Sequence, residues 1–475
     1  MSPPRVFSIP AGAAFVDLLA AGLLRRAAGE NPLALAAMTV LLPTRRACRA
    51  LREAFLAQAD GRPLLLPTMR PLGEVEEDAL GLDDPAGAGD ESEDGIPPAI
   101  DPLTRRVLLA RLVLARPDAR RTPAQAVELA TALADLLDRA QTEGRGLAAL
   151  PELVPAEFAR HWQITLEFLG LITRHWPRIL AERGAIDPAE RRNRVLRRYA
   201  ARLLADPPQA PVIAAGSTGS IPATAELLAA IARLPQGAVI LPGLDRDLDD
   251  DSWRALEPSH PQWGLKRLLG RLELDRDAVA DWEEAASGPR AALLSAAMRP
   301  AETTAAWRSL APQAGALDGL GLIEADSQEA EAGAIALAMR ETLERPGRSC
   351  ALVTPDRELA RRVAAALGRW GVNVDDSAGQ PLARTPPGAF FRLVAELASD
   401  PAAPVALLAV SKHPLAGGAD PAPFRAMART VERAALRGPR PAKTLDDLGA
   451  LLEPEARAWL GGIVAALGPL TEELG

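Results

Sequence analysis

The sequence predicts an α/β protein in which parallel, doubly wound sheets are interrupted by an all-helical insertion. Short apolar runs of strand length alternate with segments of helical spacing over residues 1 to about 70, and the alternation returns after residue 209. Strand–helix–strand order of this kind is typical of parallel sheets. Between the two stretches, residues 101–208 carry apolar side chains at helical spacing, which predicts the insertion.

Length and composition indicate several globular domains. A chain of 475 residues corresponds to about three domains. With 48% hydrophobic and 24% charged residues it can bury sizeable cores. No apolar run approaches the roughly 20 residues of a membrane span, and the N-terminus lacks a secretory signal. Cys48 and Cys350 form no metal-binding pair, so we expect a cytoplasmic protein without a metal site.

The net charge of −8 argues against a protein that simply coats nucleic acid, although it leaves room for a local basic groove. Arginine greatly outnumbers lysine. The chain contains only three lysines, which are Lys266, Lys412 and Lys443. A GC-rich genome explains this bias, because alanine, proline and glycine are abundant too. Arginine content is therefore weak evidence of phosphate binding.

The N-terminal elements follow the order of a βαβ unit. Val6–Ile9 is expected to be a strand and residues 10–14 a turn, and an apolar helix starts at Phe15. Three further segments follow, namely a strand at Thr39–Leu42 that ends at Pro43, a helix from Arg45 to Gln58, and a short apolar run at Leu64–Pro67.

The insertion is preceded by an acidic segment, residues 83–94, whose lack of large apolar side chains predicts a solvated loop. Inside the insertion, Thr122 is expected to cap a helix that has Pro at N1 and Gln at N3. A second helix is expected at 156–182, with Trp176 on its apolar face. Asp187 starts a third helix by the same capping logic.

The α/β pattern then resumes and is followed by a second α/β unit. The first stretch has strands at 212–215 and 238–241 around a helix at 222–233, and 245–320 looks irregular. The second unit, from residue 321, is expected to have helices at 329–343 and 358–370, short strands at 350–354 and 372–374, and helices over 386–475. We expect the chain to be a fragment of a longer protein.

The turn at 10–14 stands where an ATP-driven motor carries its phosphate-binding loop. Such a loop reads G-x-x-x-x-G-K-[ST], because backbone N–H groups and a lysine hold the β- and γ-phosphates and a hydroxyl holds magnesium. Here Gly12 is followed by Ala13 and Ala14, which supply neither group. The turn is either a degenerate nucleotide loop or an ordinary strand-to-helix connection, and neither interpretation predicts ATP hydrolysis.

A motor also needs an acidic pair at the end of a buried strand, and the strand at 212–215 is followed by no carboxylate. The turn after it precedes a helix and is a possible anion-binding nest. This anion turn consists of Gly216, Ser217, Thr218 and Gly219. A plain loop is the other interpretation.

No catalytic residue is predicted in this chain. Asp245 stands alone, and a solvated loop explains the following aspartates better than a metal cage does, these being Asp247, Asp249, Asp250 and Asp251. The four histidines show no metal-ligand spacing, and no Ser/His/Asp set is indicated. With aromatic residues at 4%, a stacking platform for bases is not expected.

The candidate nucleic-acid contacts are Thr44, Arg45, Arg46 and Arg49, which follow a strand and open a helix. Backbone amides and guanidinium groups meet phosphates at such a position. The alternative is a surface cap of an amphipathic helix. A second basic run, residues 191–198, is either a solvated helical face or a stripe facing DNA or a partner subunit.

These segments, taken in order, resemble the N-terminal half of the AddB subunits of AddAB helicase–nucleases, in their alphaproteobacterial form. The matching stretches run along most of the chain and are specific only in combination. They are SIPAGAAFVDLL (8–19), VLLPTRRACRALREAF (40–55), GAIDPAERRNRVL (184–196), VIAAGSTGSIPATAELLAAIA (212–232), VILPGLD (239–245), SHPQWGLKRLL (259–269), ALVTPDRELARRVAAALGRWGVNVDDSAGQPLARTPPGAFF (351–391) and SKHPLAG (411–417).

The resemblance implies RecA-like domains of the UvrD-type superfamily 1 helicase architecture. Residues 1–100 and 209–320 would form the first RecA-like domain, 101–208 its helical insertion, and 321–475 the start of a second, truncated RecA-like domain with a helical insertion. The VLLPTRR segment would line the track of single-stranded DNA. The SIPAGAA and AAGST segments depart from the motor pattern, as in AddB members taken to be motor-dead.

The resemblance also implies a function and partners. The chain would be a DNA-binding subunit that works with an AddA helicase–nuclease on double-strand DNA ends, for repair by homologous recombination. Complete AddB proteins carry a C-terminal PD-(D/E)xK nuclease domain with an iron–sulfur cluster and magnesium, and this stretch has neither its motif nor its cysteines. Two alternatives stay open, a free-standing α/β enzyme that binds a phosphorylated small molecule at the anion turn, and a pure scaffold without DNA contact.

Overall fold

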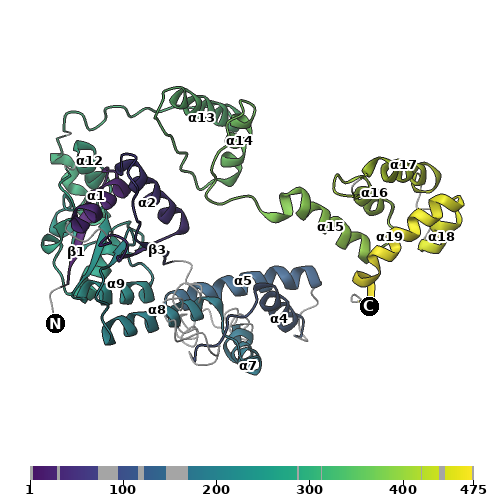
Figure 1. The fold of residues 1–475 in the computed structure, drawn as a ribbon, viewed down its shortest axis with the longest axis horizontal. Coiled ribbons are helices and arrows are strands. Elements are labelled where there is room, and N and C mark those ends of the chain that lie inside the picture. Colours follow the sequence, from purple (N-terminus) through teal and green to yellow (C-terminus); the bar gives the residue numbers. More distant parts are fainter. Residues whose placement is uncertain are drawn as a thin grey trace. The chain divides into compact units, whose positions relative to one another are not determined.

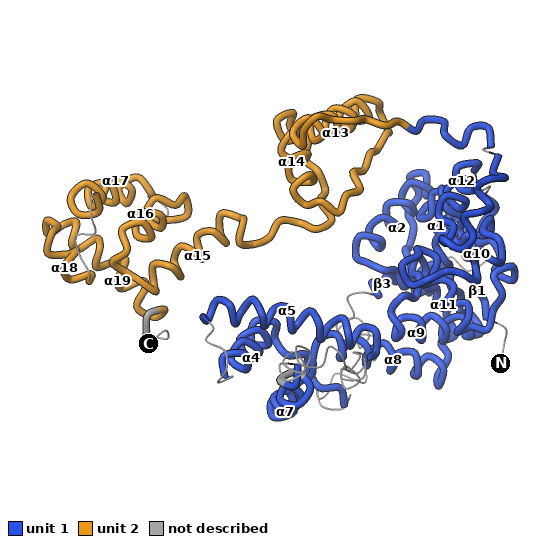
Figure 2. Tube along the Cα trace, turned by 180° about the vertical axis from the view of Figure 1, so that it is seen from behind, with its two compact units in different colours: residues 1–320 blue, residues 321–475 orange. Residues whose placement is uncertain are grey.

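The computed structural model describes residues 4–28, 33–72, 95–115, 122–145, 169–285, 288–311, 313–418, 420–437 and 444–472. The chain divides into two compact units, residues 1–320 and 321–475 (Figure 2). The acidic segment 83–94 and the first part of the predicted helix 156–182 lie outside the described residues, so the predictions made for them stay predictions.

Unit 1 is built on a six-stranded parallel sheet with the strand order β3-β2-β4-β5-β1-β6 (Figure 1). Val6 pairs with Val239 and Thr39 with Val212, and every recorded pairing is parallel. The α/β class with a parallel sheet is therefore confirmed. The strands are β1 (Val6–Ile9), β2 (Thr39–Leu42), β3 (Thr68–Pro71), β4 (Val212–Ala215), β5 (Gly237–Pro242) and β6 (Ala280–Asp281).

Two apolar cores cover the two faces of this sheet, because successive strand residues point to opposite sides. Helices α1 (Phe15–Ala27) and α2 (Arg45–Gln58) bury Leu23 and Phe55 on one face, together with Ile240 of β5. The other face is covered by α8 (Pro188–Ala205), α9 (Pro222–Arg233) and α11 (Trp263–Leu272). A short parallel bridge, Ala99 to Ile186, joins the ends of the helical insertion.

The insertion packs α4 (Pro102–Leu114), α5 (Pro123–Thr142) and α7 (Trp176–Glu182) around a core of their own. Thr122 and Gln125 cap α5 reciprocally, as predicted. Trp176 is 1% exposed, which confirms its expected place in the core.

Asp187 does not cap α8, contrary to the prediction, because its carboxylate is turned into the insertion. It is 2% exposed and forms an ion pair with the Arg105 guanidinium, with 2.9 Å between Oδ1 and Nε. Trp176 Nε1 and Gln141 Nε2 donate to its Oδ2 at 3.1 and 2.7 Å. A buried carboxylate requires such partners, so it takes the guanidinium rather than the helix N-terminus.

Several boundaries in unit 1 differ from the sequence prediction. The strand expected around Leu64–Pro67 begins only after Pro67, where the Thr68 amide can donate to Met38 O at 3.0 Å and proline could not. The described residues of the stretch 245–320, which was predicted to be irregular, form the helices α10 (Asp250–Arg254), α11 and α12 (Pro289–Ala297). Short 3₁₀ segments lie at Arg276–Ala278 and Ala301–Ser309, and a π segment at Leu171–His175.

Unit 2 has helices but, in its described residues, no strand. The strands predicted at 350–354 and 372–374 are therefore not formed, and Val353 is 94% exposed. A strand needs a neighbour for its backbone hydrogen bonds, and the described part of this unit offers these segments none. The helices predicted over 386–475 are confirmed. The helices of unit 2 are α13 (Gln328–Leu343), α14 (Arg357–Gly368), α15 (Pro386–Ser399), α16 (Pro404–Lys412), α17 (Pro421–Val431), α18 (Leu445–Ala450) and α19 (Pro454–Glu472). A 3₁₀ segment lies at Leu382–Arg384 and a π segment at Glu432–Leu436.

Replacement of Gly22 by alanine should destabilise unit 1. Gly22 lies in α1, and a Cβ atom there would stand 2.6 Å from Cε2 of Trp282, which is 1% exposed and cannot move aside freely. We expect Gly22→Ala to lower the free energy of unfolding by about 1–3 kcal/mol in urea titrations. Gly270→Ala is the control, because Gly270 of α11 faces open space and should gain about 0.5–1 kcal/mol of stability. Equal effects of the two changes would contradict the packing argument.

Removal of the buried carboxylate should unfold the insertion more easily. Asp187→Ala leaves the donors of Trp176 and Gln141 without their acceptor and removes one of the two carboxylates that pair with Arg105, the other being Asp138, so we expect a loss of about 1–3 kcal/mol. Glu182→Ala removes an ion pair whose two side chains, Arg178 and Glu182, are 70% and 67% exposed, and should cost less than about 0.5 kcal/mol. Chemical denaturation followed by tryptophan fluorescence measures both. A loss for Asp187→Ala no larger than that for Glu182→Ala would refute the role of the pair.

Candidate functional site

Three of the segments singled out in the sequence meet at one edge of the sheet. In a parallel sheet the loops that follow the strands all leave from the carboxyl edge, which is where α/β proteins bind ligands. The turn after β1 touches the loop after β5, since a Cβ atom on Gly243 would lie 3.3 Å from Ala11 Cβ. A Cβ atom on Gly216, at the end of β4, would lie 3.5 Å from both Phe15 Cε1 and Pro43 Cγ. The β1, β2 and β4 loops are therefore neighbours.

The turn after β1 is shaped like a loop that could approach a phosphate but lacks the groups to hold one. Gly12 has φ of +85°, in the left-handed region that glycine tolerates. Ala13 N–H donates to Pro10 O at 3.3 Å, and Ala14 begins α1 without a side-chain cap. Asp17 lies in the first turn of α1, where a carboxylate opposes the binding of another anion.

The anion turn after β4 is partly closed by its own contacts. Gly216 and Gly219 have φ of +77° and +62°, and Gly216 N–H donates to Ile240 O at 3.0 Å. Gly219 is buried, and its N–H donates to Ser217 Oγ at 3.3 Å. Helix α11 packs on the turn at Thr218, whose carbonyl oxygen would lie 3.3 Å from a Cβ atom on Gly264. These contacts occupy donors that a phosphate would otherwise use.

The β2–α2 turn presents the candidate DNA contacts at the surface. Thr44 caps α2, and its hydroxyl accepts from Ala47 N–H at 3.1 Å. Arg45 and Arg46, in the first turn of α2, are exposed. Arg49 is also exposed and pairs with Glu53, with 3.0 Å between Nε and Oε1, so its charge is partly compensated.

Sequence reasoning missed Arg70, which the strand register places on the face of the sheet opposite α2, because its partner Leu41 belongs to the core covered by α8, α9 and α11. Arg70 lies on β3 and pairs in register with Leu41 of β2, one strand away from the Thr44 turn. It was overlooked because the strand was expected to end at Pro67, before Arg70. The signal in the sequence that could have identified Arg70 is an arginine near the carboxyl end of a strand.

Several arginines of the second basic run form contacts within unit 1. Arg191 Nε donates to Pro97 O at 3.2 Å, and Arg192 donates to Thr142 Oγ1 at 2.8 Å. Arg194 pairs with Glu190 at 2.7 Å and Arg197 with Glu226 at 3.0 Å. Arg191, Arg192 and Arg197 thus join α8 to other segments of unit 1, whereas the Arg194–Glu190 pair lies within α8. Because Arg194, Arg197 and Arg198 are exposed, a solvated face and a stripe facing DNA or a partner subunit both stay open as interpretations.

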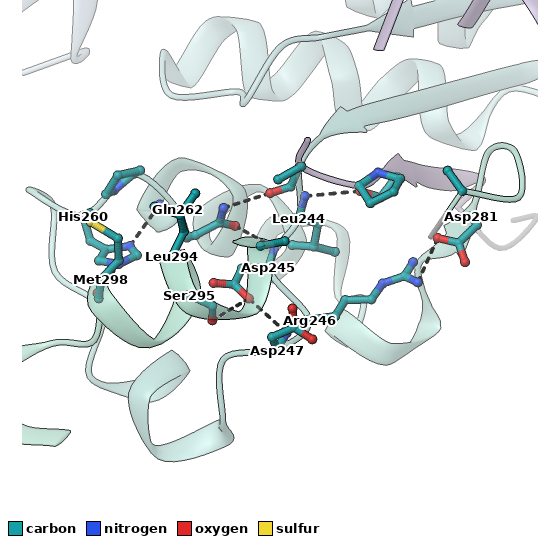
Figure 3. A pocket seen from close by; sticks show the side chains of 17 residues that line it. Leu244, Asp245, Arg246, Asp247, His260, Gln262, Asp281, Leu294, Ser295 and Met298 are labelled. Atoms are coloured by element: carbon teal, nitrogen blue, oxygen red, sulfur yellow. Dashed lines mark hydrogen bonds and ion pairs between the residues drawn. The ribbon is translucent and has the colours of Figure 1, made fainter. Parts of the chain in front are cut away.

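A pocket of about 230 Å³ opens beside the β1 turn, between the carboxyl ends of β1 and β5 and helix α12 (Figure 3). Asp245 has a structural role here, because its Oδ1 accepts from Asp247 N–H, Leu248 N–H and Ser295 Oγ at 2.9, 3.0 and 2.9 Å. Arg246 pairs with Asp281 at 2.9 Å across the mouth. The polar groups of the pocket wall mainly bind one another.

Asp249 is exposed, as expected for a solvated loop, and it also has a structural role. It caps α10 by accepting from Ser252 N–H at 2.8 Å, and it pairs with Arg299. The Ser252 amide and then the Arg299 guanidinium lower the pKa of Asp249 to about 2. The described residues contain no group of three His, Cys, Asp or Glu side chains placed to hold a metal ion. In the same residues, no helix has the length and apolar character needed to span a membrane.

Comparison with known proteins assigns no family to this chain. It matches no protein family model and no curated protein. The carboxyl edge of the unit 1 sheet is therefore the basis on which a function can be proposed.

The charge of Asp249 should stabilise unit 1 only above acidic pH. Because its folded-state pKa of about 2 lies below the unfolded value near 3.8, the stabilisation is complete above about pH 4 and disappears as the pH falls through about 2. We expect Asp249→Asn, which keeps a capping side chain, to lower the melting temperature at pH 7 and to match the original protein near pH 2. Asp251→Asn removes a pair with Arg254 in which both side chains are at least 74% exposed, and should change little. A deficit of Asp249→Asn that does not vary with pH would contradict this assignment.

Proposed function

We propose that this chain is a motor-inactive, helicase-like subunit that binds DNA within an AddAB-type helicase–nuclease. The observation that carries the proposal is the composition of the carboxyl edge of the unit 1 sheet. The loops where a motor holds ATP and magnesium lack the lysine, the hydroxyl and the carboxylates. The neighbouring β2–α2 turn nevertheless keeps a helix N-terminus with Arg45 and Arg46 exposed.

The arrangement of this turn supports contact with a phosphate backbone. The N-terminal end of α2 is the positive end of the helix dipole, and it carries no acidic residue in its first turn. Arg45 and Arg46 add guanidinium groups, which bind phosphate oxygens in a bidentate manner. Such contacts position a nucleic acid without reading its sequence. The parallel sheet supports the RecA-like assignment, because loops that line a ligand must share one edge.

In this proposal the chain guides one DNA strand and the AddA-type partner hydrolyses ATP. The complex would process double-strand DNA ends for recombinational repair, and nuclease activity would depend on parts beyond this stretch. The alternative of a small-molecule enzyme at the anion turn is less well supported, because Gly219 is buried with its N–H already bonded. A pure scaffold differs from the proposal in one respect, which is that Arg45 and Arg46 would not contribute to DNA binding.

The proposal is tested by the binding of a fluorescently labelled single-stranded oligonucleotide, alone and with the co-expressed AddA-type partner. We expect the Arg45→Ala/Arg46→Ala variant to bind at least about tenfold more weakly, the loss of roughly one charge-assisted hydrogen bond or more. Its plot of log affinity against log salt should be shallower by about 1.4, since each phosphate contact to a single strand contributes about 0.7. Fluorescence anisotropy at several salt concentrations measures both quantities.

The matched control removes two exposed arginines of the insertion, Arg174 and Arg178. The same net charge is lost there, so nonspecific electrostatics would weaken both variants alike. Equal binding by the original protein and the Arg45→Ala/Arg46→Ala variant would refute the proposed DNA contact and favour a scaffold. Stabilisation of the chain alone by a nucleotide would favour the small-molecule alternative.

A further inference from the structure

The side chain of Phe15 lies where the three loops of the carboxyl edge meet. Phe15 is the first residue of α1, directly after the β1 turn, and is half-buried against the core beneath α1 and α2. Its Cε1 atom and the Pro43 ring both border Gly216, each 3.5 Å from a Cβ atom placed there. One aromatic ring therefore reaches from the β1 loop to the end of β4, and the ring of Pro43, the residue before Thr44, borders the same glycine.

A second contact ties the other end of α2 to the same turn of α1. Gln58 is the last residue of α2, and its Nε2 donates to Asp17 O at 2.7 Å, two residues after Phe15. Thr44 closes the N-terminal end of α2 through its bond to Ala47 N–H. Helix α2 is thus linked to the first turn of α1 by Gln58, and the turn that precedes α2 borders the same glycine as Phe15.

We propose that Phe15 is a positioning residue that holds the Thr44–Arg46 turn ready for DNA in the absence of any nucleotide. This inference rests on the proposed function. In an ATP-driven motor, phosphates held by a lysine and a hydroxyl bind at the β1 turn, and here Ala13 and Ala14 offer no such contact. Apolar packing of Phe15 needs no ligand, so it maintains one arrangement of the loops at all times.

The expected consequence is a preorganised binding turn. A segment that is already ordered does not lose conformational entropy on binding. If the competent arrangement falls to about a tenth of the population, the apparent Kd rises about tenfold. DNA affinity of the original chain should accordingly be the same with and without ATP and magnesium.

The test compares Phe15→Ala with Phe15→Leu in the full 475-residue chain. We expect Phe15→Ala to raise the Kd for a single-stranded oligonucleotide about tenfold and to speed hydrogen exchange of the amides of residues 43–47. Leucine keeps most of the apolar volume, so Phe15→Leu should stay within about twofold of the original Kd. Phe15→Val takes the place of Phe15→Ala if the alanine variant does not fold.

Phe7→Leu is the matched control for a general loss of stability. Phe7 packs against the same core, with its ring 5.4 Å from that of Trp282, away from the β2–α2 turn. Unchanged DNA affinity and unchanged exchange at 43–47 in Phe15→Ala would overturn the inference, as would an affinity of the original chain that rises with ATP and magnesium. The two proposals can fail separately. If the original chain binds no DNA, the proposed function is refuted. If hydrogen exchange at residues 43–47 is nevertheless faster in Phe15→Ala than in the original chain, the positioning role of Phe15 is supported.

Discussion

The parallel pairing of the unit 1 strands is the constraint on which the rest of this unit depends. Because β1, β2, β4 and β5 run in one direction, the segments that follow them emerge at a single edge. Residues separated by more than 200 positions in the chain, such as Ala11 and Gly243, come into contact there. The same pairing sends the helices to the two faces, where they form the two cores. Any site made from several loops of this unit has to form at that edge.

The helical insertion is organised by a different interaction, the buried ion pair between Asp187 and Arg105. These side chains are taken from water at a large cost, which their mutual attraction and the bonds from Trp176 and Gln141 offset. The pair joins α4 to the start of α8, and α8 continues onto α9 of the sheet layer. Its geometry therefore links the core of the insertion with the core of the α/β layer.

The candidate site has no groups that would hold a nucleotide, but it has arginines at a helix N-terminus. The β1 and β4 loops have glycines at positive φ and lack the groups with which an ATP-driven motor holds ATP and magnesium. The β2–α2 turn keeps its helix N-terminus and its arginines. Under the proposed function, these loops would serve binding rather than hydrolysis, since geometry alone cannot stabilise the charge of a transferred phosphoryl group.

Much of this was decided by the sequence itself. Local patterns correctly predicted β1, β2, β4 and the capping box of α5, because apolar period and capping act within a few residues. The missing lysine and hydroxyl of the β1 turn are also properties of the sequence alone. Tertiary structure decided the roles of Asp187, Asp249, Arg191 and Arg192, whose partners lie far away in the chain. It also decided the absence of strands in the described part of unit 2, since a strand exists only where a neighbour accepts its hydrogen bonds.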